Sequence, residues 1–154
     1  MNSLKENVLA AAYRPEVRTE VRRLYGDLQR EIDRRNPLCV MSGRCCRFSE
    51  FGHRLYATTV ELAAFVGELS EFSPDPATSG PVGECPFQSG KICRVRAFRP
   101  LGCRVFFCDP TANEWQQGIY EQFHARLKQL HDDLSIPYSY VEWRFACQTL
   151  GLGL

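Results

Sequence analysis

Cysteine placement constrains this chain most, because seven of its eight cysteines lie between residues 39 and 108. They form three separated groups: Cys39, Cys45 and Cys46; Cys85 and Cys93; and Cys103 and Cys108. Thiols at this density are typical of metal ligands or of disulfides. Thiolate sulfur is a soft ligand that suits zinc, copper(I) and iron–sulfur clusters, and four thiolates suffice for a tetrahedral zinc site or a [4Fe–4S] cluster.

The spacing of these cysteines matches no common local metal motif, because the chain has no Cys-x2-Cys pair. Ligands must therefore come from separate segments, and the fold rather than one short loop sets the geometry of the site. Seven thiols exceed the four that one site needs, so the spacing leaves open which of them bind and whether there are one or two sites. The eighth, Cys147, stands far from the three groups and is expected to be a buried core thiol.

The composition is typical of a globular protein and narrows the range of partners. The chain has 154 residues, 44% of them hydrophobic, and a net charge of +1, which suits a single domain and gives no cationic excess for nucleic-acid binding. No apolar run approaches the roughly 20 residues of a membrane helix, and the first residues lack a signal-peptide core, so we expect a cytoplasmic protein without membrane contact. Thiols stay reduced in that compartment, which favours metal over disulfides, while the even number of cysteines keeps disulfides as an alternative.

A long helix and a short helix are expected before the second cysteine group. Residues 15–36 carry apolar side chains every three or four positions, which is the period of one helical face. A shorter helix is expected over residues 58–69, where Thr58 and Glu61 have the spacing of a capping box. Residues 70–84 are rich in Ser, Pro and Gly and are expected to form a loop.

A second long helix follows the third cysteine group. It is expected to begin near residues 109–111, with Thr111 and Glu114 as a second capping box, and to end before Pro137. Residues 85–108 are expected to form short turns, including a tight turn at residues 89–91.

The tail over residues 138–147 alternates apolar and polar side chains, which predicts a half-buried strand. Its apolar face would consist of Val141, Trp143, Phe145 and Cys147. These patterns predict a mainly α fold with short strands, a small α+β protein, around a loop-rich, cysteine-lined metal-binding centre. We expect a single domain over residues 1–154, made of an N-terminal helix (15–36), a cysteine-cluster core (37–108) and a C-terminal helix with its tail (109–154).

Basic side chains interleave with the cysteines. Arg99 and Arg104 are candidate cofactor-binding residues, because guanidinium groups beside an anionic metal–thiolate centre lower thiolate pKa values, although either could equally be a surface residue. His53 is a candidate ligand or hydrogen-bond donor, or an ordinary loop histidine. His124 and His131 lie beside the apolar face of the second long helix and are expected to be solvated.

One longer motif joins the second and third cysteine groups and reads Cys85-Pro-Phe-x2-Gly90-x2-Cys93-x6-Pro100-x2-Cys103-Arg104-x3-Cys108. Together with the first group, Cys39 to Cys46, it resembles the YkgJ-type cysteine-cluster family, also described as the CxxCxxCC zinc- or iron-chelating domain. The resemblance covers residues 39–108 and implies that these thiols chelate iron or zinc. The chain departs from that family at Ser42, where the first motif of the family has a cysteine, so ligands are expected from several segments.

The leading hypothesis is a cytoplasmic metal-binding protein that holds a cysteine-ligated iron–sulfur cluster of the [4Fe–4S] type in a redox or accessory role. A structural zinc module that presents its long helices to a protein partner is an alternative. A metal-dependent group-transfer enzyme is another, because the thiol missing at Ser42 would leave a metal position open. No Ser-His-Asp arrangement, Gly-rich phosphate loop or Rossmann fingerprint stands out, so catalytic residues are not assigned.

Overall fold

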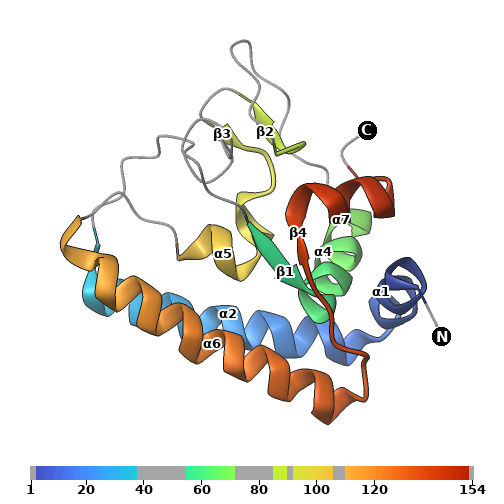
Figure 1. The fold of residues 1–154 in the computed structure, drawn as a ribbon, viewed down its shortest axis with the longest axis horizontal. Helices are drawn as coiled ribbons and strands as arrows, with labels where there is room; N and C mark the ends of the chain where they lie inside the picture. The colour runs from blue at the N-terminus through green and yellow to red at the C-terminus, as the bar shows by residue number, and fades with distance from the viewer. Residues whose placement is uncertain (1–2, 38–54, 72–84, 90–91, 106–109, 153–154) are drawn as a thin grey trace.

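The fold is seen in a computed structural model that describes residues 3–37, 55–71, 85–89, 92–105 and 110–152 (Figure 1). These residues are mainly helical, as the sequence predicts, and they form two small antiparallel sheets of two strands each. The α-helices are α1 (Leu4–Ala12), α2 (Pro15–Arg35), α4 (Thr59–Glu71), α5 (Leu101–Arg104), α6 (Asn113–Leu134) and α7 (Trp143–Leu150). The strands are β1 (Tyr56–Thr58), β2 (Gln88–Ser89), β3 (Ile92–Cys93) and β4 (Tyr140–Glu142), and two 3-10 helices are η2 (Arg96–Phe98) and η3 (Pro110–Ala112).

Helix α2 confirms the first predicted long helix. Pro15 occupies the first turn, where its missing N–H leaves no bond unmade, and Asn36 closes the helix in the left-handed region with a φ of 52°. The buried face follows the apolar repeat of the sequence, with one tyrosine added to it. Its members are Val17, Val21, Leu24, Tyr25, Leu28 and Ile32.

Helix α4 lies at the centre of the fold. Residues 59–65 are all buried, and the helix packs against both α1 and α2. Helix α6 runs beside α2, and the pair forms one long edge of the molecule (Figure 1). The sequence predicts α4 and α6 but not α1, whose start is capped by Ser3 and Glu6 in a complete capping box. No helix among the described residues is long and apolar enough to cross a membrane.

The second predicted capping box, at Thr111 and Glu114, is wrong. Helix α6 begins at Asn113 and its N-cap is Ala112, without a side-chain hydrogen bond to the cap. The reason is the preceding 3-10 turn η3, which includes Thr111 and moves the start of the α-helix past that threonine.

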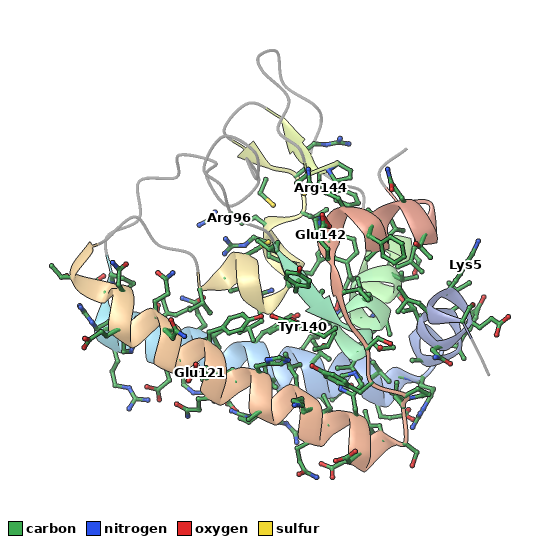
Figure 2. The ribbon with its side chains drawn as sticks, viewed as in Figure 1. Lys5, Arg96, Glu121, Tyr140, Glu142 and Arg144 are labelled. Carbon is green, nitrogen blue, oxygen red and sulfur yellow. The ribbon has the colours of Figure 1, made fainter. Side chains whose placement is uncertain are left out.

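The predicted strand over the tail is wrong beyond Glu142, because a helix, α7, follows the short strand β4. The Glu142 carboxylate accepts hydrogen bonds from the backbone N–H groups of Arg144 and Phe145, which satisfies free donors in the first turn. Figure 2 shows Glu142 and Arg144 close together at this point. Phe145 is 56% exposed, whereas the alternation places it inside. The side chains that α7 buries are Trp143, Ala146 and Cys147.

The two sheets connect distant parts of the chain. Strand β1 pairs with β4, so the residues just before α4 lie beside the residues just before α7 (Figure 1). Strand β2 pairs with β3 and flanks the predicted tight turn, of which Gly90 and Lys91 lie outside the described residues. This hairpin lies away from the α2–α6 pair, on the same side of the fold as α7 (Figure 1).

Candidate metal centre

The structure describes three of the seven candidate cysteine ligands, namely Cys85, Cys93 and Cys103. Among residues 3–37, 55–71, 85–89, 92–105 and 110–152, no group of three or more His, Cys, Asp or Glu side chains is placed to hold a metal ion. The predicted metal centre therefore stays a prediction. The other candidate ligands lie outside the described residues, and they are Cys39, Cys45, Cys46, Cys108 and His53. Ser42, where the chain departs from the family motif, also lies outside them.

Cys93 belongs to strand β3 of the β2–β3 hairpin, and Cys85 lies three residues before strand β2. The base of the hairpin is closed by a backbone hydrogen bond in which Arg94 N donates to Phe87 O at 2.8 Å. Cys85 is buried and Cys93 is half-buried. The hairpin therefore brings both cysteines of the second group to the same end of a short, tight element. Aromatic rings in mutual contact pack beside it, and they are Phe65, Phe87, Phe98 and Trp143.

A hydrogen bond joins the indole of Trp143 to the sulfur of Cys85. Nε1 donates to Sγ at 3.2 Å, and both residues are buried. A buried indole N–H needs an acceptor, and a thiol sulfur is a weak one, whereas an anionic sulfur accepts a stronger, charge-assisted bond. Hydrogen bonds of this kind to cysteine sulfur also tune metal–thiolate centres. The environment of Cys85 therefore fits a thiolate ligand.

Cys147 lies near Cys85 but belongs to helix α7, and its burial confirms the prediction of a core thiol. It is 1% exposed within α7. Burial raises the pKa of the Cys147 thiol, and the nearby sulfur of Cys85 raises it further. A thiol with a raised pKa stays protonated at neutral pH and is a poor metal ligand. Cys147 thus provides an internal comparison for the clustered cysteines.

Cys103 lies in the short helix α5 and is 7% exposed. Its backbone N–H donates to Pro100 O at 3.0 Å. Two residues earlier, at the first residue of α5, Leu101 N donates to the Glu61 carboxylate at 2.7 Å. A side chain of α4 therefore holds the helix that carries this cysteine.

Glu61 is the main polar residue of the core, and it is 3% exposed. Besides the bond from Leu101, its carboxylate accepts hydrogen bonds from Thr58 N at 2.9 Å, the Thr58 hydroxyl at 3.0 Å and the Tyr25 hydroxyl at 3.0 Å. These four bonds use the lone-pair capacity of a carboxylate. Burial, followed by the charge of Glu61, raises the pKa of Tyr25 well above its usual value, so the phenol stays a donor.

Sequence reasoning identifies Glu61 only as half of a helix cap. The bond from Thr58 N to its carboxylate does belong to such a cap, but the links to Tyr25 and Leu101 connect three elements. One sequence feature could have indicated this role: Glu61 stands in an otherwise apolar stretch of α4. An acid in such a stretch is expected to be buried with hydrogen-bond partners.

The two arginines predicted to support the cofactor contact the backbone of their own segment. Arg99 donates through Nε to Arg96 O at 3.0 Å and through Nη1 to Cys103 O at 3.4 Å. Arg104 donates to Arg99 O and, at 3.0 Å, to Ala97 O. Both therefore stabilise the turn that holds Cys103. Burial lowers the pKa of the Arg104 guanidinium, which lies 4.1 Å from the centroid of the Tyr25 ring.

The prediction that His131 is solvated is wrong, because this side chain is 1% exposed. Its Nε2 accepts a hydrogen bond from Val60 N at 3.2 Å, and its Nδ1 lies 2.7 Å from Leu127 O and donates to it. The ring is therefore the neutral tautomer, and burial lowers its pKa. His124 is half-buried. Its Nε2 lies 2.9 Å from the Tyr138 hydroxyl oxygen, and its ring stacks on the ring of Tyr140.

Comparison with protein-family models, with curated proteins and with solved structures finds no match to this chain.

Proposed function

We propose that this protein binds a metal centre through its clustered cysteines, with an iron–sulfur cluster as the leading candidate and zinc as the alternative. The observation that carries the proposal is the hydrogen bond from Trp143 Nε1 to Cys85 Sγ, because a buried N–H aimed at sulfur suits a thiolate. The candidate ligands are Cys39, Cys45, Cys46, Cys85, Cys93, Cys103 and Cys108.

Two further features of the described residues support thiolate ligation. Cys103 sits in a helix held by the buried Glu61, so its position is fixed by the core rather than by a free loop. The buried rings of Phe65, Phe87 and Trp143 would limit solvent access to a centre beside Cys85, and solvent access affects the redox potential of an iron–sulfur cluster. The cysteine motif also resembles the YkgJ-type cysteine-cluster family, which supports iron or zinc as the ligand.

The proposal is tested by purifying the full chain without oxygen and measuring iron, zinc, acid-labile sulfide and the visible spectrum. We expect bound iron and sulfide with visible charge-transfer absorption, and we expect Cys85→Ala and Cys103→Ala to lose most of the metal. The matched control is Cys147→Ala, which removes a thiol outside the three groups and should keep the metal. A folded wild-type protein without metal would overturn the proposal.

The alternatives give different results in the same assay. A structural zinc module gives colourless protein with stoichiometric zinc, which unfolds when a chelator removes the metal. A group-transfer enzyme requires an open metal position, and Ser42→Cys would then change metal content or reactivity. Disulfides would appear as a loss of free thiols in protein that contains no metal.

A further inference from the structure

A cavity of about 310 Å³ lies between α2, α4 and the segment that leads into α5. It falls within the usual size range of small-molecule sites. Its walls are mainly apolar, with two aromatic rings in contact, since the Phe65 and Phe98 centroids are 5.2 Å apart. Val21 and Ala64 extend this apolar wall, and Arg104 is among the polar residues that line the cavity.

The two carboxylates that line the cavity already have partners. Glu61 accepts four hydrogen bonds from Thr58, Tyr25 and Leu101, as described above. Glu68 accepts a hydrogen bond from Arg22 and forms an ion pair with Arg18. Glu68 is thus charge-compensated by two arginines, whereas the donors to Glu61 are neutral groups and its charge attracts Arg104 without a direct ion pair.

Arg104, in contrast to Glu68, is bound by backbone carbonyl groups rather than by a carboxylate. Two of its donors bind the carbonyl oxygens of Arg99 and Ala97, and its flat face covers the Tyr25 ring. Among the described residues no acidic side chain forms a direct ion pair with Arg104, although the charge of Glu61 acts on it from within the same cavity. A partly buried cation without a bonded anion is costly, and a guanidinium pairs especially well with a carboxylate.

We infer that this cavity binds a small organic carboxylate with an aromatic or other apolar body. The carboxylate lies against the Arg104 guanidinium, and the body lies against Phe65 and Phe98 in the apolar part of the cavity. No cysteine lines the cavity among the described residues, so the inference does not depend on the metal centre.

Gly26 on α2 allows this site to be closed without removing any polar group. It lines the cavity, and a Cβ added there meets nothing within 4 Å. Gly118 on α6 is a matched control, because a Cβ there also meets nothing within 4 Å and the residue does not line this cavity. Both glycines lie inside long helices, so the same substitution changes helix propensity alike at both sites.

The test is a titration of the full chain with 3-phenylpropionate, followed by calorimetry and by ligand-observed NMR. We expect saturable binding with a dissociation constant in the millimolar range or tighter. Gly26→Leu should weaken it by at least about 10-fold, because the leucine side chain fills the cavity. Gly118→Leu should bind like the wild type. If Gly26→Leu fails to fold, the smaller Gly26→Ala is used, and its binding should be weakened measurably relative to Gly118→Ala.

A ligand series tests the role of the charge without any mutation. The uncharged 3-phenylpropan-1-ol and the cationic 3-phenylpropan-1-amine should each bind at least about 10-fold more weakly than the carboxylate. Three results would overturn the inference: no saturable binding of the carboxylate to the wild type, equal binding of the amine, or unchanged binding by Gly26→Leu.

Discussion

The indole N–H of Trp143 donates to the sulfur of Cys85 at 3.2 Å, which ties the first residue of α7 to the second cysteine group. The backbone of Trp143 is held in place, because its N–H donates to Leu55 O at 2.7 Å, one residue before β1. The partner of a candidate ligand therefore comes from a part of the chain that carries none of the clustered cysteines.

Replacing Trp143 with phenylalanine removes this N–H and leaves a small cavity. We expect the free energy of unfolding to fall by about 2 kcal/mol, which combines the lost hydrogen bond and the lost packing. If Cys85 binds metal, the variant should also lose metal faster to a chelator. The control is Trp115→Phe, since the other tryptophan of the chain lies on α6. Equal rates of metal loss in the two variants would exclude a role for this bond.

Glu61→Gln tests the buried carboxylate that holds α5. An amide cannot accept from all four donors, because its NH2 group faces at least one of them as a second donor. We expect a loss of about 2 to 3 kcal/mol in urea unfolding. Glu121→Gln, at an exposed position on α6, should change stability by no more than about 0.5 kcal/mol. A similarly small effect for Glu61→Gln would show that the buried network does not stabilise the fold.

The long helices could be predicted from sequence because the residues that specify each helix are close together along the chain. The apolar repeat of α2 and its proline and asparagine ends lie within one continuous stretch. Helix α7 could not be predicted in the same way. Its alternation resembles a strand, and the deciding features are the Glu142 cap and the pairing of β4 with β1, which is distant in sequence.

The candidate site could be predicted only in its residue types. The spacing of the cysteines indicates metal chemistry, but the partners of Cys85 and Cys103 come from α7 and α4. Likewise, His131 lies four residues after Leu127 on the buried face of α6, but its hydrogen-bond donor, the Val60 N–H, comes from the start of α4. Such contacts depend on how the helices pack, which no local pattern specifies.

Glu142→Ala tests the origin of α7. Loss of the cap should cost about 1 kcal/mol and should fray the turn that carries Trp143. Glu142→Asp keeps a carboxylate of the preferred N-cap type, so it should retain most of the stability. The measurements are urea unfolding and amide hydrogen exchange over residues 143–147. If alanine and aspartate variants exchange at the same rate, the cap is not what starts this helix.

The lowered pKa of His131 predicts how the free energy of unfolding changes in mild acid. Its ring accepts from Val60 N in the neutral form, and burial lowers its pKa in the folded protein below the value of about 6.5 expected in the unfolded chain. The unfolded state therefore binds more protons below that pH, so the stability is complete above about pH 6.5 and falls as the pH decreases toward the folded-state pKa. Each unit of separation between the two pKa values corresponds to about 1.4 kcal/mol. His124, whose pKa burial also lowers, contributes with the same sign.

Urea unfolding measured between about pH 7 and pH 5 should therefore show a steeper loss of stability for the wild type than for His131→Gln, which does not titrate at this position. Equal slopes for the two proteins would show that His131 is not the group responsible.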